Sequence, residues 1–501
     1  MKVKISLLVL LFASALVVTM VPMQSARSTE PEALEIAGTW DVKSVPWYGV
    51  SPVQCILYED AGPPEIVGDI AYNLDMIDVE NVGETGEDIY VAVLDTGLMY
   101  NWMNYLPVER IRTDLGKGFS YNTIYWDEEY QDFFLDDFYD TRGFITELGQ
   151  PWNDYGAPYG DGHGTHVTSI ITGYNYVSTY WGQEFWVGGV APNVYIIPVL
   201  VLDTWIGYVP PGQTVDPGYY LVGGGSYEMV AAGIRYCADL AKQLDIKIVI
   251  SMSLGGRSLG KVEKRAIDYA IRNGCIVVAA AGNEGQEQIT YPGAYSPVIC
   301  VASGGWTLEN IGTGSSPHSP PYRWWLSDVP ENFYTLDENG NEFQLFVNDF
   351  SGRPNPELGQ SWCDLDVCGP GSWIVGPYSP YGSLIGGGAY FGYYYVGGTS
   401  QATPHVSGIA SLVLQKYPDL VQWQMQMILK IAGIANKMTK GYKDGSAIVY
   451  AWQDGFYDYE EFTWTAWDYG TGFLQADAAL CTAFLFKLTM NRCSFYSLYM
   501  H

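Results

Sequence analysis

Five apolar runs mark the middle of the chain, and each ends in small or polar residues. They cover residues 88–97, 194–203, 246–256, 274–285 and 297–305. Because the apolar positions are nearly continuous rather than alternating, both faces of each strand should be buried, as in a parallel sheet. In such sheets, functional side chains gather at the carboxyl ends of the strands.

Helical patterns lie between and after these runs. Residues 166–174, 226–244 and 261–274 have helical spacing, and Gly274 suits the position just beyond a helix end. A further helix is predicted over 402–414, with a proline tolerated in its first turn. The alternation predicts an α/β fold, a doubly wound and mostly parallel sheet with helices on both faces.

Four segments are acidic, aromatic and rich in glycine and proline, and none keeps the periodicity of a helix or a strand for long. They are residues 98–150, 204–222, 306–347 and 371–394. We interpret them as long surface loop insertions on a single domain.

The first 26 residues resemble a secretory signal peptide, with two lysines, an apolar run over 5–22 and small residues after it. This predicts a secreted or extracytoplasmic protein. An uncleaved membrane anchor is the alternative, because the run nearly reaches spanning length. The predicted organisation is a signal peptide at 1–26, a short extension at 27–69, one domain at 70–480 and an unassigned tail at 481–501.

Charge and cysteine content limit the classes of binding partner and the compartment in which the protein can work. The 501 residues carry a net charge of −30, which argues against nucleic acid and anionic membranes as partners. The acidic stretch 126–140 is a candidate for structural Ca²⁺, with a solvated loop as the alternative. Eight cysteines fit an oxidising compartment. Cys363 and Cys368 are close enough in sequence to pair, and Cys275 is expected to be a buried thiol.

Ser400 lies where the helix after Gly397 and Gly398 should begin, so its hydroxyl meets the positive end of a helix dipole. It is either an N-cap or a nucleophile. A nucleophile needs a base, and His163 is placed for this between two glycines. A metal site of His163 with His166 is the alternative, but it lacks a third ligand.

Two strand ends supply the remaining groups. Asp95 could hold a histidine ring by accepting from one nitrogen, or could be an ordinary turn residue. Asn283 could donate to an oxyanion together with the backbone N–H of Ser400, or could also be a turn residue. The other histidine of this region, His405, is expected to pack in a helix interface.

Five motifs in this order resemble the subtilisin-like serine peptidases: VAVLDTG, DGHGTHV, SMSLGG, AAAGNEG and GGTSQATPHVSG. The resemblance spans about 70–480, with the insertions unmatched. It implies that Asp95 orients His163, that His163 is the general base, that Ser400 is the nucleophile and that Asn283 is the oxyanion donor. It also implies no cofactor for the chemistry, with structural Ca²⁺ compatible.

The resemblance further implies that an extended peptide or protein substrate is clamped between two strand edges. These edges are Gly223, Gly224 and Gly225, and Ser253, Leu254 and Gly255. Ala280, Ala281 and Gly282 would line an apolar pocket, with no acid, for the residue before the scissile bond. Many members carry Met and Ser where this chain has Gln401 and Thr403, and neither residue is expected to have a catalytic role.

Of three rival interpretations, only the first remains open. A peptide-binding relative that has lost catalysis would keep the fold, although every catalytic residue type is present. An α/β-hydrolase would place its acid and histidine after the serine, and residues 398–402 break its G-x-S-x-G turn. A carboxyl-type relative would have Glu where His163 stands.

Overall fold

The computed structural model describes residues 36–41, 70–145, 162–178, 183–214, 217–306, 325–326, 345–378, 392–435, 445–453, 456–465 and 467–499. The predicted signal peptide and most of the extension lie outside these ranges. Within them, no helix combines the length and apolar character that a membrane span needs.

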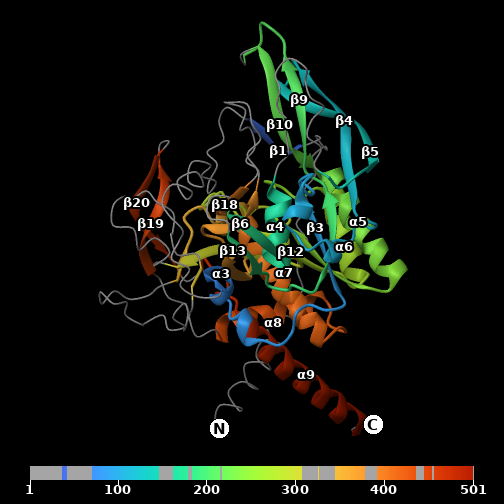
Figure 1. The fold of residues 1–501 in the computed structure, drawn as a ribbon, viewed down its shortest axis with the longest axis vertical. Coiled ribbons are helices and arrows are strands. Elements are labelled where there is room, and N and C mark those ends of the chain that lie inside the picture. The colour runs from blue at the N-terminus through green and yellow to red at the C-terminus, as the bar shows by residue number, and fades with distance from the viewer. Residues whose placement is uncertain are drawn as a thin grey trace.

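A central sheet has the strand order β15-β13-β12-β11-β3-β8-β4-β5, with β16 also beside β13 (Figure 1). Five of its strands pair with one another in parallel, and one of them, β13, also pairs antiparallel with β15. They are the five predicted strands, now β3 (Ile89–Asp95), β8 (Tyr195–Leu200), β11 (Lys247–Met252), β12 (Ile276–Ala280) and β13 (Ile299–Trp306). The predicted mostly parallel α/β sheet is confirmed.

Helices cover both faces of this sheet, as the continuous apolar runs predict. Val91 and Val93 of β3 belong to one buried cluster, which includes residues of α4 and α7. Ala92 and Leu94 belong to a second cluster, with residues of α5 and α6. The helix bounds are α4 His163–Thr172, α5 Tyr227–Leu244, α6 Lys261–Arg272, α7 Thr399–Lys416, α8 Gln422–Ala435 and α9 Ala476–Tyr499.

Smaller elements complete the described chain. The helix α3 (Tyr72–Asp75) follows the strand β2 (Ile70–Ala71), which pairs with β14 (Trp325–Leu326). The remaining strands are β1 Ile36–Asp41, β6 Gly173–Ser178, β7 Gln183–Gly188, β15 Leu345–Val347, β16 Val367–Pro370, β17 Ile374–Tyr378, β18 Gly392–Val396, β19 Gly445–Gln453 and β20 Phe456–Trp464. The described part of the tail 481–501 continues α9, which projects from the body of the molecule (Figure 1).

Two segments predicted as loops are in fact long β-hairpins that rise together from the sheet (Figure 1). They are β4 (Lys117–Asp127) with β5 (Asp132–Arg142), and β9 (Asp203–Val209) with β10 (Gly218–Ser226). Their tips are joined, because the Gln131 side chain donates to Gln213 at 2.5 Å and accepts from the Thr214 backbone N–H at 2.8 Å.

The acidic stretch 126–140 belongs to the first of these hairpins. Asp127 uses its carboxylate to cap the turn, accepting from the backbone N–H groups of Glu129 at 2.8 Å and Tyr130 at 3.0 Å. Among the described residues, no group of three or more His, Cys, Asp or Glu side chains is arranged to hold a metal.

Cys363 and Cys368 are close in sequence but do not pair. Both thiols are free: Cys363 is exposed in a short 3₁₀ turn, whereas Cys368 is buried in β16. Strand pairing with β13 directs Cys368 into the core and away from the surface turn. Cys275 is a buried free thiol, as predicted, and burial raises its pKa to about 12.

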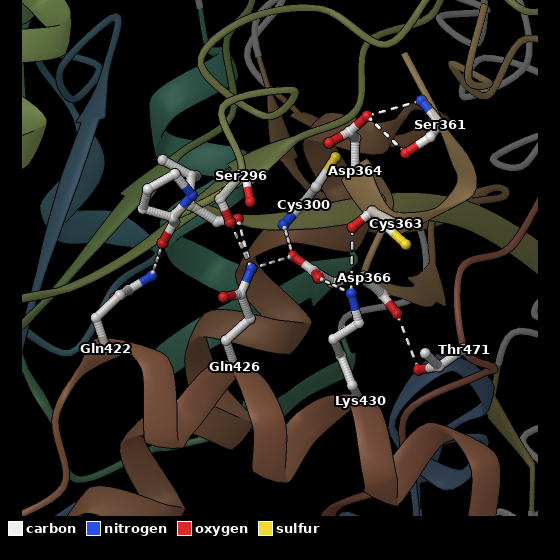
Figure 2. A network of polar contacts seen from close by, with 12 residues as sticks. Ser296, Cys300, Ser361, Cys363, Asp364, Asp366, Gln422, Gln426, Lys430 and Thr471 are labelled. Carbon is white, nitrogen blue, oxygen red and sulfur yellow. Dashed lines mark hydrogen bonds and ion pairs between the residues drawn. The ribbon is translucent and has the colours of Figure 1, made fainter. Parts of the chain in front are cut away.

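A buried carboxylate ties α8 to the sheet (Figure 2). Asp366 is 1% exposed and accepts from the Cys300 backbone N–H at 2.8 Å, Gln426 Nε2 at 3.0 Å and Lys430 Nζ at 2.7 Å. Its backbone carbonyl accepts from the Thr471 hydroxyl at 2.9 Å. Burial raises the pKa of the Asp366 carboxyl, and the Lys430 ammonium opposes that rise.

A second buried acid, Glu263, leads to a prediction about stability. It lies in the first turn of α6, is 2% exposed, and its Oε2 has no partner among the described residues. Burial raises its pKa from 4.5 to about 8. Because unfolding therefore releases a proton between these values, the free energy of unfolding should fall as the pH rises from about 4.5 to 8.

Glu263→Gln removes this ionisation. At pH 7 the variant should be more stable than the wild type by about 3 kcal/mol, with little difference at pH 4. Urea unfolding of both proteins at the two pH values measures this. A stability difference that is the same at pH 4 and pH 7 would contradict the assigned pKa.

Candidate active site

The candidate residues gather at the carboxyl edge of the sheet. Asp95 is the last residue of β3, and Ser253 and Asn283 follow the ends of β11 and β12. His163 begins α4 and Ser400 is the second residue of α7. The strand ends and helix starts of a doubly wound fold thus bring together residues that are far apart in sequence.

The first contact joins Asp95 to His163. The His163 Nδ1 lies 2.8 Å from Asp95 Oδ1, which also accepts from the Thr96 backbone N–H at 2.7 Å. The Asp95 side chain is fully buried, whereas that of His163 is 20% exposed. Because a carboxylate accepts from Nδ1–H, this contact favours the tautomer whose Nε2 can take a proton.

Ser400 is joined to Ser253 by two reciprocal hydrogen bonds. The Ser400 hydroxyl donates to the Ser253 carbonyl at 3.2 Å, and the Ser253 hydroxyl donates to the Ser400 carbonyl at 2.7 Å. These bonds fix the start of α7 against the end of β11. Sequence analysis assigned Ser253 only to a peptide-binding edge and missed this contact.

The side-chain amide of Asn283 is oriented by Thr399. Its Oδ1 accepts from both the backbone N–H and the hydroxyl of Thr399, each at 3.0 Å. Its NH₂ group is left to face the space beside Gly398. A methyl carbon placed on Gly398 would lie 3.5 Å from Asn283 Nδ2 and 3.6 Å from the Ser400 nitrogen, so two donors converge there.

The two neighbouring histidines are core residues. His166 and His405 are fully buried, and burial lowers their pKa values to about 3 and about 4. His166 Nε2 contacts the Ile374 carbonyl at 3.1 Å, so the alternative metal pair with His163 finds no support. His405 is packed as expected, with its Nδ1 2.7 Å from the Gln401 carbonyl. His318 and His501 lie outside the described residues.

The first predicted peptide edge carries a strand of this chain. Gly223, Gly224 and Gly225 lie in β10, and β1 pairs with β10 antiparallel. In that pairing Ala37 faces Gly225 and Trp40 faces Gly223. The edge therefore accepts an added strand, and its assignment to substrate stays a prediction.

The second predicted edge, Ser253 to Gly255, follows β11. Leu254 is partly buried against the core, and a methyl group on Gly255 would lie 2.2 Å from Thr290 Oγ1. Next to it, Gly256 exchanges backbone hydrogen bonds of 2.7 and 2.8 Å with Tyr291. Close packing against Thr290 thus requires glycine at 255.

The predicted pocket residues present backbone rather than side chains. Ala280 and Ala281 are buried. A methyl group on Gly282, which has φ +92°, would lie 2.3 Å from Glu284 Oε2 and 2.5 Å from Thr290 Oγ1. The Glu284 carboxyl group therefore lies against Gly282, and the assignment of this segment to an apolar pocket without an acid stays a prediction. Sequence analysis missed Glu284 because its chain position did not reveal that it folds back over Gly282.

Comparisons with known proteins identify the family of the chain. The sequence profile of the Subtilase family matches residues 86–440. Thermitase of Thermoactinomyces vulgaris is 32% identical over 263 residues, which cover 52% of this chain and 64% of thermitase. Subtilisin of Bacillus sp. (strain TA39) is 28% identical over 384 residues, which cover 74% of this chain and 67% of that protein.

Among solved structures, a protease from Pseudoalteromonas arctica PAMC 21717 has a TM-score of 0.48 and 22% identity, and the match covers 87% of this chain and 99% of that one. The profile match spans more than half of the sequence and includes all the residues of the candidate site. The chain therefore belongs to the subtilase family of subtilisin-type serine endopeptidases.

Proposed function

We propose that this chain is a secreted serine endopeptidase that hydrolyses peptide bonds through Asp95, His163 and Ser400. The 2.8 Å contact between the buried Asp95 carboxylate and the partly exposed His163 ring carries the proposal. A buried carboxylate on one ring nitrogen leaves the other nitrogen basic and stabilises the imidazolium once it forms.

The proposed reaction begins when the Ser400 hydroxyl turns from the Ser253 carbonyl toward His163. As Ser400 Oγ attacks the peptide carbonyl, His163 Nε2 takes its proton and the carbonyl oxygen becomes negative. Asn283 Nδ2 and the Ser400 N–H donate to this oxygen. His163 then protonates the leaving amine, and a water molecule hydrolyses the acyl-enzyme by the same steps in reverse order. All groups come from the chain, so the chemistry needs no cofactor.

The proposed substrate is an extended peptide or protein segment that adds as a strand to Gly223–Gly225 and to Ser253–Gly255. The antiparallel pairing of β1 with β10 supports this, because it demonstrates that the edge accepts a strand. A substrate would have to take the place of β1. The segment Ala280–Gly282, with Glu284 beside it, would receive the residue before the scissile bond.

The remaining parts of the proposal concern location and organisation. We propose residues 1–26 as the signal peptide and 70–480 as the peptidase domain, with no nucleic-acid partner and no membrane association after cleavage. The apolar run over 5–22 and the net charge of −30 support these assignments.

A fluorophosphonate probe tests the proposed function, because it phosphonylates only an activated serine. Peptide mass mapping of the purified protein should find the adduct on Ser400, and labelling should be at least about 100-fold slower in His163→Ala. A folded protein that is not labelled, even after removal of the residues before 70, would instead support a binding relative without catalysis.

A further inference from the structure

Gln401 directly follows Ser400, and its side chain reaches the space beside Gly398. The residue is 1% exposed, and its Oε1 lies 2.9 Å from the position that a methyl carbon on Gly398 would take. The same position lies within 3.6 Å of Asn283 Nδ2 and of the Ser400 nitrogen. The Gln401 amide thus shares this space with both proposed oxyanion donors.

The orientation of this amide is decided by hydrogen bonding, because its oxygen and nitrogen have nearly the same shape. With Oε1 toward Gly398, the Nε2 of Gln401 is buried and has no partner among the described residues. A buried donor without an acceptor is unfavourable. This orientation also points a carbonyl oxygen at the place where negative charge develops. Turning the amide by 180° removes both conflicts and leaves a buried carbonyl, which tolerates missing partners better.

We propose that Gln401 is a third donor of the oxyanion hole, with its NH₂ group turned toward the space beside Gly398. The inference rests on the proposed peptidase function and deepens it. When Ser400 attacks, an electron pair of the substrate C=O bond moves to the oxygen, and Gln401 Nε2–H donates to it beside Asn283 and the Ser400 N–H. No bond to Gln401 forms or breaks. This assignment revises the expectation that Gln401 has no catalytic role.

Gln401→Met tests the donor, because Met has similar length and no N–H group. We expect kcat to fall about tenfold to 100-fold with KM changed less than about twofold, since the bond strengthens only in the transition state. Affinity for a peptide aldehyde, which forms a tetrahedral adduct with the serine, should fall by the same factor. Gln401→Glu, which offers acceptors only, should lower kcat further.

Thr403→Ser is the matched control. It is the other departure in the same motif, and its hydroxyl donates to the Thr399 carbonyl at 2.8 Å. Because serine keeps that donor, kcat and aldehyde affinity should stay within about twofold of the wild type. If Gln401→Met does not fold, Gln401→Leu provides the same measurement in another apolar side chain.

A Gln401→Met enzyme with unchanged or higher kcat would overturn the inference. So would a lower kcat with unchanged aldehyde affinity, which would indicate a structural role only. Measurements on the wild-type protein distinguish a wrong role for Gln401 from a wrong proposed function. If wild-type Ser400 is labelled by the fluorophosphonate and turns over peptides, only the role of Gln401 is rejected; if it does neither, both proposals fall.

Discussion

Ser400→Ala is expected to remove nearly all peptide hydrolysis while leaving the fold intact. The loss in kcat should be about 10⁶-fold, the magnitude known for removal of the serine of the subtilisin triad. The physical reason is that alanine has no oxygen to attack the peptide carbonyl, so no acyl-enzyme forms. Folding should survive, because the substitution removes one 3.2 Å hydrogen bond and keeps the 2.7 Å bond from the Ser253 hydroxyl to the backbone of residue 400.

The double variant with His163→Ala sharpens this prediction. Because the proposed base and nucleophile act as one unit, the two losses should not add, and the double variant should be about as slow as either single variant. Turnover of a chromogenic peptide by the three purified proteins measures this, with circular dichroism as the check on folding. A Ser400→Ala protein that kept even a tenth of wild-type kcat would show that another residue is the nucleophile.

Asp366→Ala should lower the free energy of unfolding by about 3–5 kcal/mol, because it breaks a buried ion pair by removing one partner. The Lys430 ammonium would lose its carboxylate, and the backbone N–H of Cys300 and the amide of Gln426 would lose their acceptor (Figure 2). The backbone N–H of Cys300 is buried and would be left without an acceptor, whereas Gln426 and Lys430 are only partly buried, which favours the lower end of this range. Urea unfolding at pH 7 gives the value.

Asp364→Ala is the matched control for this experiment. Asp364 lies two residues away and accepts only from exposed groups of Ser361, at 2.7 and 3.2 Å (Figure 2). Its loss should cost about 1 kcal/mol or less, as for other exposed caps. Equal destabilisation by the two variants would mean that burial of the Asp366 network does not matter.

The sequence patterns predict the core of this fold well, and they fail at its edges. Residues 89–94 and 276–280 are apolar throughout because both faces of β3 and β12 are covered, and that continuity marks them as strands. In β4, by contrast, Asn122, Thr123 and Tyr125 are exposed. Both hairpins bury some side chains, such as Phe119 and Tyr121 of β4 and Trp205 of β9, but exposed residues interrupt the apolar pattern, so both hairpins are predicted as loops.

In the candidate site, too, one part can be predicted from the sequence and another part cannot. Motif order predicts Asp95, His163 and Ser400 as the site residues, because the proposed chemistry requires particular residue types at strand ends and helix starts. The contacts that support these residues cannot be predicted from sequence patterns. That Thr399 holds the Asn283 amide, or that Gln401 reaches the space beside Gly398, depends on how α7 is placed against the end of β12.

The spread of the candidate site along the chain also has a consequence for biosynthesis. Asp95 and His163 are made early, together with β3 to β13, whereas the proposed nucleophile is made only after 399 of the 501 residues. Synthesis proceeds from the N-terminus, and domains fold largely as units. A nascent chain therefore contains the proposed base, His163, but not the proposed nucleophile. The site is complete only after α7 forms and Ser400 makes its two hydrogen bonds to Ser253 at the end of β11. Such an order would keep a peptidase from cutting its own unfinished copies inside the cell that makes it.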